Sequence, residues 1–258
     1  MITLLLARHG QASFGSKNYD KLSALGCQQA RLLGQHYART GRRIDTILSG
    51  SLVRQRDSAW HFWEHYQPSI MTDNTTHTTT THTTPIFDIQ RPDNHVLPIF
   101  NEFNHEDVFI KASPNLATQA QIADELNRTN QPLTRLGELF ILAMQRWHAG
   151  EHDHEYLESW PQFSARAQQA LEQLQAQIMQ KMPLEQDHTV LVFTSGGVIA
   201  AITAQLLQQG SQMAYQLTKS SVNTGVTSIS LQHAAPQLLS FNEYSHLFAG
   251  GECFVTQH

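Results

Sequence analysis

Near its amino terminus the chain reads Ile2-Thr3-Leu4-Leu5-Leu6-Ala7-Arg8-His9-Gly10, an apolar run that ends in two basic side chains and a glycine. Such a run is typical of a buried strand followed by a tight turn. Arg8 and His9 are therefore expected at the carboxyl end of a sheet strand, where open α/β sheets bind ligands. Histidine can attack phosphorus as a neutral nucleophile, and arginine can hold phosphoryl oxygens with paired hydrogen bonds. The stretch indicates phosphate chemistry, although a match of three residues also occurs by chance.

Apolar runs alternate with segments of helical spacing along the rest of the chain. Further strands are expected over residues 44–49, 189–193, 226–231 and 238–241, with a short extended piece over 96–100. Helices are expected after Ser23, from Leu52, over residues 115–128, along the stripe from Leu136 to Trp147, after Ser159 and after Gly197. Strands that alternate with helices predict a three-layer α/β/α sandwich around a mostly parallel sheet. No internal repeat is found, so residues 1–258 are expected to form one domain.

The composition excludes several classes of protein. Hydrophobic residues make up 40% of the 258, as in a globular protein, and no segment approaches the ~20 uninterrupted apolar residues of a membrane span. The amino terminus lacks the pattern of a signal peptide, and two cysteines are too few for a disulfide framework. We therefore expect a cytoplasmic protein. A formal charge of −5 without a cluster of Lys and Arg argues against nucleic acid as a ligand.

Two segments are rich in histidine. Residues 72–84 are mostly threonine with His77 and His82, a polar tract that we expect to be a disordered surface loop. The turn over residues 150–155 places His152 and His154 among acidic residues, which would suit a metal ion, but such mixtures are more often solvated loops. We assign no metal site and expect no cofactor.

Four motifs, in this order and spacing, resemble those of the histidine phosphatase superfamily, also called the phosphoglycerate mutase-like family. They are Arg8-His9-Gly10, the segment 20–30, Ile47-Leu48-Ser49-Gly50-Ser51-Leu52-Val53-Arg54, and Leu191-Val192-Phe193-Thr194-Ser195-Gly196-Gly197. The resemblance extends to about residue 247. It implies a phosphoglycerate mutase-like fold in which residues 101–160 form a small helical cap over the mouth of the sheet.

The resemblance also implies the roles of individual residues. His9 would be the nucleophile, and Arg8 and Arg54 would hold the phosphoryl group, a task for which lysine is a poor substitute. Glu102, in the segment that leads into the cap, would protonate the leaving group and then activate water. Glu106 and Asp107 are the reserve candidates for that acid. The pair Asn223-Thr224 would help to line the pocket.

The last motif departs from the family pattern, because Ser195 stands where a second histidine is usual. A serine hydroxyl can still donate one hydrogen bond, and backbone N–H groups at a helix start point at an anion. We therefore expect Ser195, Gly196 and Asn18 to bind phosphate together with Arg8 and Arg54. Exchanging Ser195 for histidine is expected to give a modest gain, since the glycines that follow leave room for the ring. A serine hydrolase is disfavoured, because Phe193 stands where a nucleophile elbow needs glycine.

These observations predict a metal-independent phosphatase that hydrolyses small phosphomonoesters through a phosphohistidine. Its partner would be a small phosphorylated metabolite or free phosphate, with no nucleic acid and no membrane, while the oligomeric state stays open. One alternative is a phosphate-binding or regulatory protein whose catalysis is weakened by the loss of the histidine. A phosphoglycerate mutase-type phosphotransferase ranks lower, because Lys111 and Arg128 are the only Lys or Arg between Glu102 and Pro132.

Overall fold

A computed structural model gives the fold and describes residues 2–13, 20–66, 95–112, 119–181, 187–232 and 235–257. The threonine-rich tract over residues 72–84 and the predicted phosphate ligand Asn18 lie outside these ranges. Every structural statement below refers to the described residues.

A five-stranded sheet with the strand order β2-β3-β1-β4-β5 forms the centre of the fold. Its strands are β1 (Ile2–Arg8), β2 (Thr46–Ser49), β3 (His188–Thr194), β4 (Val226–Ser230) and β5 (Gln237–Glu243). The β2–β3 and β3–β1 pairs are parallel, whereas the β1–β4 and β4–β5 pairs are antiparallel. The expected mostly parallel sheet is thus confirmed only in part, because β4 runs against both of its neighbours.

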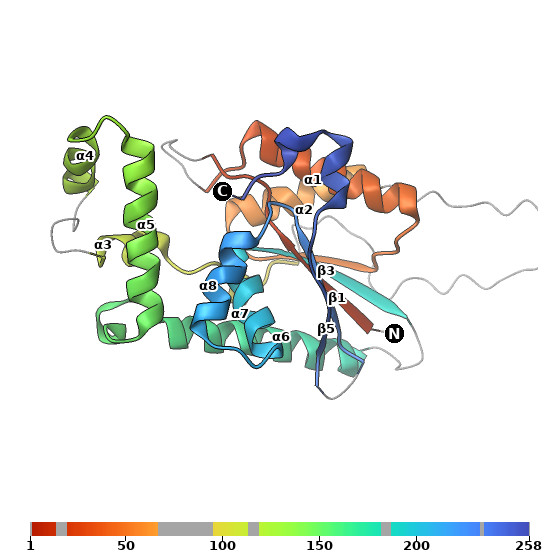
Figure 1. Cartoon of the computed structure of the whole chain (residues 1–258). Coiled ribbons are helices and arrows are strands. Elements are labelled where there is room, and N and C mark those ends of the chain that lie inside the picture. The colour runs from red at the N-terminus through yellow and green to blue at the C-terminus, as the bar shows by residue number, and fades with distance from the viewer. Residues whose placement is uncertain are drawn as a thin grey trace, which may run out of the picture.

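Helices cover both faces of the sheet, as the alternation of side chains along β1 requires. Leu4 and Leu6 belong to one hydrophobic cluster, with α6 (Trp160–Lys181) and α7 (Gly196–Leu206). Leu5 and Ala7 belong to the other, with α1 (Ala24–Thr40) and α2 (Val53–His65). Successive side chains of a strand point to opposite faces, so a fully apolar strand is buried between two helical layers. Figure 1 shows the two pairs of helices on either side of the sheet, and the three-layer α/β/α sandwich is confirmed.

Local signals place the helices around the site. Ser23 caps α1, its side chain accepting a hydrogen bond from the N–H of Gly26, and Gly41 ends the helix in the left-handed conformation. The helices α2 and α7 follow directly on β2 and β3. Their amino-terminal ends therefore lie beside the carboxyl ends of these strands, as the motif positions predicted.

Several elements differ from the expectations. Residues 98–100 form a short 3-10 helix instead of a strand, with only Val96 bridged to Ser49. Two helices, α3 (His105–Ile110) and α8 (Ser211–Ser220), were not predicted from the sequence. With α4 (Gln119–Asn127) and α5 (Pro132–Ala149), α3 lies beyond the end of the sheet that is opposite the N-terminus (Figure 1).

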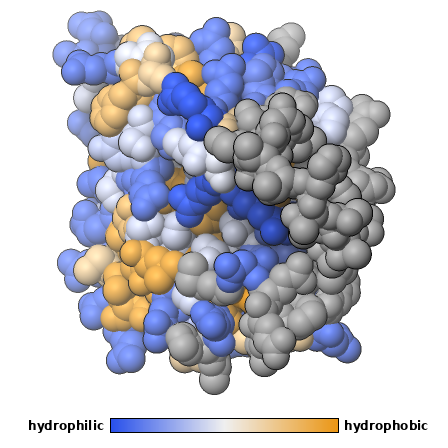
Figure 2. All heavy atoms as spheres, turned by 90° about the vertical axis from the view of Figure 1, so that its right-hand side faces the viewer, coloured by the Kyte–Doolittle hydropathy of each residue, from blue (hydrophilic) through white to orange (hydrophobic). Residues whose placement is uncertain are grey.

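The apolar stripe predicted along α5 is only partly buried. Ala143 and Trp147 are buried in the main hydrophobic cluster, but Phe140 is 40% exposed. On another face of the molecule, Figure 2 shows mainly hydrophilic side chains with hydrophobic residues in separate small groups. Among the described helices, none combines the length and apolar character that crossing a membrane would require.

Candidate active site

The carboxyl ends of β1, β2 and β3 bring the sequence motifs together. The N–H of His9 donates to the carbonyl of Thr194 (2.8 Å), which ties the turn after β1 to the end of β3. The N–H of Gly50 donates to the carbonyl of Phe193 (3.0 Å), which ties the turn after β2 to the same strand. Three motifs that are far apart in sequence therefore meet at one edge of the sheet.

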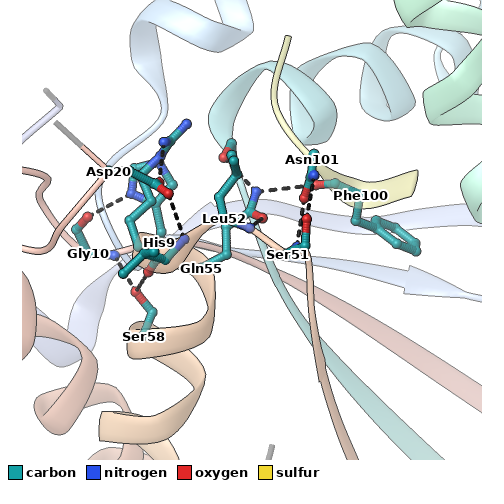
Figure 3. A network of polar contacts seen from close by, with 12 residues as sticks. His9, Gly10, Asp20, Ser51, Leu52, Gln55, Ser58, Phe100 and Asn101 are labelled. Atoms are coloured by element: carbon teal, nitrogen blue, oxygen red, sulfur yellow. Dashed lines mark hydrogen bonds and ion pairs between the residues drawn. The ribbon is translucent and has the colours of Figure 1, made fainter. Parts of the chain in front are cut away.

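His9 is buried and held in one orientation. Its Nδ1 lies 2.7 Å from the carbonyl oxygen of Gly10 (Figure 3). Its Nε2 lies 3.1 Å from Nε of Arg54. Because a carbonyl oxygen only accepts, Nδ1 carries the proton and Nε2 keeps its lone pair. Burial, and then the charges of Arg54 and Arg8, hold the pKa of His9 well below its usual value. The imidazole is thus neutral at neutral pH, with an unprotonated Nε2.

Arg54 is fixed at the start of α2 by a carboxylate and by the helix itself. Its Nη1 lies 2.8 Å from Oδ1 of Asp20, whose Oδ2 accepts from the N–H of Val53 at 2.9 Å. The hydroxyl of Ser58 donates to the Arg54 carbonyl (2.7 Å) and accepts from the N–H of Gly10 (3.0 Å). Sequence reasoning missed Asp20 as a site residue, although it begins the second motif.

Arg8 reaches from the end of β1 toward backbone carbonyls. Its Nη1 donates to the carbonyl of Ser221 and to that of Gln257 (3.0 Å). The guanidinium also lies beside Gly196, where a Cβ would stand 3.4 Å from Nε of Arg8. The first residue of α7 and the predicted phosphate ligand Arg8 are therefore neighbours.

Glu102 reaches the amino-terminal end of α7. Its Oε2 accepts from the N–H of Gly197 (3.0 Å) and its Oε1 from the N–H of Phe103 (3.3 Å). A Cβ at Gly197 would collide with this carboxyl group, so the glycine makes the contact possible. Burial raises the pKa of Glu102, while these hydrogen bonds and the charges of Arg54 and Arg8 act in the opposite direction. A carboxylic acid with a raised pKa suits the donation of a proton.

The reserve acids do not reach the site. Glu106 is exposed in the first turn of α3. Oδ2 of Asp107 accepts a hydrogen bond from the N–H of Leu157 at 2.8 Å, which ties α3 to the segment before α6. Neither carboxylate therefore lies in the candidate site. Of the three acids, Glu102 is the one that lies near Arg54 and Arg8.

His105 joins the site as a residue to which the sequence analysis assigned no role. It is the first residue of α3, half-buried, and its ring centroid lies 4.3 Å from that of Phe103. Burial, with Arg54 and Arg8 nearby, lowers the pKa of His105 to about 3. A neutral imidazole thus stands close to both guanidinium groups. The sequence shows that position 105 is a histidine, but the direction of its side chain depends on how α3 packs.

Ser195 lies at the turn between β3 and α7 and is fully buried. Its side chain makes no capping hydrogen bond to α7. Instead its Oγ accepts a hydrogen bond from Nε2 of Gln55, at 2.8 Å. Gln55 follows Arg54 in α2, is also fully buried, and was not predicted to belong to the site.

The pair Asn223-Thr224 supports the turn after β1 from behind. Nδ2 of Asn223 donates to the His9 carbonyl (3.2 Å), and the N–H of Thr224 donates to the Arg8 carbonyl (3.1 Å). Thr224 has φ of 60°, and its hydroxyl pairs with Nε2 of His246 at 2.9 Å. Both side chains of the pair are fully buried, so they position the backbone of Arg8 and His9.

The acidic turn over residues 150–155 lies apart from these groups. Nδ1 of His152 pairs with Glu155 (3.0 Å), and Arg146 pairs with the same carboxylate (2.8 Å). In the part of the chain that the structure describes, no group of three or more His, Cys, Asp or Glu side chains is arranged to hold a metal ion.

Comparison with known proteins identifies a family. The model of the histidine phosphatase superfamily (branch 1) matches residues 4–75 and 126–244, about three quarters of the chain. No curated protein sequence matches.

Solved structures resemble the fold over nearly its whole length. One is a phosphoserine phosphatase from Entamoeba histolytica in complex with phosphoserine, with a TM-score of 0.58, 18% identity, and coverage of 96% of this chain and 100% of that one. A mycobacterial glucosyl-3-phosphoglycerate phosphatase has a TM-score of 0.56 and 21% identity, with 94% and 99% covered. A phosphoglycerate mutase from Bacillus anthracis has a TM-score of 0.57 and 16% identity, with 97% and 96% covered. At these identities the likeness concerns the fold, and it confirms the phosphoglycerate mutase-like architecture.

Proposed function

We propose that this chain, which belongs to the histidine phosphatase superfamily, hydrolyses small phosphomonoesters through a phosphohistidine on His9 and without a metal ion. Membership of the family makes the protein a phosphoric monoester hydrolase of the histidine phosphatase type. Our proposal adds the substrate class, the covalent intermediate and the roles of single residues.

The first step transfers the phosphoryl group to His9. The lone pair on Nε2 forms a bond to phosphorus while the bond from phosphorus to the ester oxygen breaks. Glu102 gives its proton to the departing alkoxide and becomes a carboxylate. Arg8 and Arg54 neutralise the charge that spreads over the three equatorial oxygens, and this electrostatic contribution dominates phosphoryl transfer.

The second step returns the enzyme to its starting state. The Glu102 carboxylate takes a proton from a water molecule, whose oxygen attacks phosphorus as the phosphorus–nitrogen bond breaks. His9 leaves as a neutral imidazole, and inorganic phosphate is released. Protons and electrons balance without any further reactant.

One observation carries the proposal: Nδ1 of His9 is bound to the Gly10 carbonyl at 2.7 Å, while Nε2 faces Nε of Arg54 at 3.1 Å. This arrangement leaves an unprotonated ring nitrogen at the place where a guanidinium group can hold the phosphoryl oxygens. The neutral state expected from the lowered pKa of His9 supports it.

The intermediate can be trapped chemically. Rapid quenching of the enzyme with ³²P-labelled phenyl phosphate should give acid-labile, alkali-stable label on the peptide that contains His9. His9→Ala should abolish the label, whereas His36→Ala, which removes a half-buried histidine from the carboxyl-terminal half of α1, should retain it. Turnover with label on no histidine would contradict the mechanism.

The phosphate-binding alternative stays in view because Ser195 brings no charge to the pocket. It is separated from the enzyme by hydrolysis of p-nitrophenyl phosphate: a binding protein would show a Kd for phosphate but a rate no higher than that of His9→Ala. A cytoplasmic location also belongs to this proposal, and the free thiols of Cys27 and Cys253 support it.

A further inference from the structure

Ser195 occupies the capping position of α7 without acting as a cap. A serine before a helix usually accepts a hydrogen bond from the N–H of the second or third helical residue. Here the second helical residue is Gly197, and its N–H donates to Oε2 of Glu102 at 3.0 Å. The Ser195 side chain makes no bond to the helix that it precedes. Its hydroxyl is therefore available for a different use.

Gln55 sets the orientation of that hydroxyl. Nε2 of Gln55 lies 2.8 Å from Oγ of Ser195 and 3.3 Å from the carbonyl of Phe100, while Oε1 accepts from the N–H of Leu52 at 3.3 Å. Figure 3 shows the Gln55 side chain among Leu52, Phe100 and Asn101. An amide nitrogen only donates, so the Ser195 oxygen is the acceptor and the hydroxyl proton is left for another acceptor.

The surrounding backbone is shaped to hold the Gln55 amide. A Cβ at Gly50 would collide with the Gln55 side-chain oxygen, so a residue without a side chain is required there. Both Gln55 and Ser195 are fully buried. A buried polar group is costly unless it is bonded, and the Gln55 amide has partners for both of its ends.

The hydroxyl lies between the groups that face the predicted phosphate. The residue before it, Thr194, accepts the N–H of His9 at 2.8 Å, and the residue after it, Gly196, lies beside the Arg8 guanidinium. The Ser195 hydroxyl is therefore carried by a turn whose neighbouring residues contact the backbone of His9 and the guanidinium group of Arg8. An anion held by these residues is the acceptor that this position offers.

We propose that Gln55 is a positioning residue that fixes the Ser195 hydroxyl as a hydrogen-bond donor to the bound phosphoryl group. This inference rests on the proposed phosphate site and adds a specific role within it. It also reverses the expectation for Ser195→His. The room that the glycines were expected to leave is taken by the Gln55 amide, so an imidazole at position 195 collides with it.

The test measures binding of orthovanadate, a phosphate-like anion, by calorimetry, so that it does not depend on turnover. Ser195→Ala removes the donor, and Gln55→Met removes the amide while keeping a side chain of similar length. Each should weaken vanadate binding about tenfold, and the double variant should be no weaker than either single one, because both act through one hydrogen bond. Gln55→Met should lower kcat while changing KM for p-nitrophenyl phosphate less, as expected for a contact made mainly in the transition state.

A matched control is available in Gln175, a buried glutamine of α6 whose amide donates to the Leu231 carbonyl at 3.4 Å. Leu231 pairs with Ile2, at the opposite end of β1 from His9. Gln175→Met should leave vanadate binding at the wild-type level, and circular dichroism should show that all variants are folded. If Gln55→Met also keeps wild-type binding, or if its effect adds to that of Ser195→Ala, Gln55 only fills space and the proposal is wrong.

A second pair of variants tests the same geometry by steric means. Ser195→His alone should bind vanadate at least tenfold more weakly than wild type, and Ser195→His combined with Gln55→Ala should regain most of that loss. A gain from Ser195→His alone would overturn the proposal. Wild-type protein that binds vanadate but never turns over would contradict the phosphatase and leave the pair intact, whereas wild-type protein that binds no vanadate would overturn both.

Discussion

The turns after β1 and after β3 form two halves of one site, and they differ in charge. The half after β1 is cationic: it contains the Arg8 guanidinium and the neutral His9, whose Nε2 accepts a hydrogen bond from the Arg54 guanidinium. The half after β3 offers neutral groups: the Ser195 hydroxyl, to which α2 brings the Gln55 amide, and the first N–H groups of α7, one of which binds Glu102. Under the proposed mechanism, positive charge and the nucleophile are therefore concentrated on one side of the site, while proton delivery and neutral hydrogen bonds come from the other.

The nucleophile should account for the largest effect. His9→Ala removes the attacking nitrogen, so kcat/KM for p-nitrophenyl phosphate should fall by about 10⁴-fold or more, as expected when a nucleophile is lost. Vanadate binding should persist, because both arginines remain. Retention of more than about one hundredth of the wild-type rate would show that the two halves do not divide the chemistry in this way.

Glu102 should give the next largest effect, and one that depends on the leaving group. Glu102→Gln keeps the shape but cannot protonate an alkoxide, so kcat/KM for an alkyl phosphate should fall by about 10²- to 10⁴-fold. The loss for p-nitrophenyl phosphate should be much smaller, because that leaving group is stable without a proton. Equal losses for both substrates would contradict the role of general acid.

The pH profile tests the same residue. Because the pKa of Glu102 is raised, its acid form persists to higher pH than that of an ordinary glutamate, and the wild-type rate should decline as pH rises through that pKa. The lowered pKa of His9 keeps the nucleophile neutral well below its usual pKa of about 6.5, so the acid side of the profile should lie below that value. Glu102→Gln should abolish the decline at high pH and leave the acid side unchanged.

Arg54 should contribute less than the reacting groups. Arg54→Ala removes one of two guanidinium groups that face the transition-state charge, so kcat/KM should fall by about 100-fold or more. Arg54→Lys should recover only part of the loss, because an ammonium cannot form the paired hydrogen bonds. A loss below tenfold would move Arg54 out of the site and weaken the contrast between the two halves.

Asp20 should have the smallest effect among the substitutions. Asp20→Asn keeps its shape but removes the carboxylate that pairs with Nη1 of Arg54 at 2.8 Å. The Asp20 side chain is 32% exposed, so solvent screens the pair, and a loss of about two- to fivefold in kcat/KM is expected. A loss as large as that of Arg54→Ala would mean that Asp20 acts on the reaction directly.

Chelation should change nothing. Two arginines and a histidine nucleophile already supply the charge and the attacking group, so activity should be unaffected by EDTA. Loss of activity that zinc or magnesium restores would direct attention to the turn that contains His152 and His154.

Local sequence patterns were sufficient for the frame of the fold. Apolar runs located all five strands of the sheet to within a few residues, and Ser23 marked the start of α1. The reversed direction of β4 and the helices α3 and α8 were not predicted. Strand direction is set by how connections pack back on the sheet, and short helices such as α3 carry too few residues for a periodic signal.

The candidate site divides in the same way. By itself the sequence determined where the residues of the half after β1 lie, because a strand, a turn and a helix start are local features that place Arg8, His9 and Arg54 at one edge of the sheet. Only the tertiary structure decided that Asp20 holds Arg54, that His105 lies near both arginines, and that the Gln55 amide meets the Ser195 hydroxyl. Each of these contacts joins side chains from different elements. Their formation depends on side-chain directions and on the space left by glycines such as Gly50 and Gly197, which no pattern along the chain encodes.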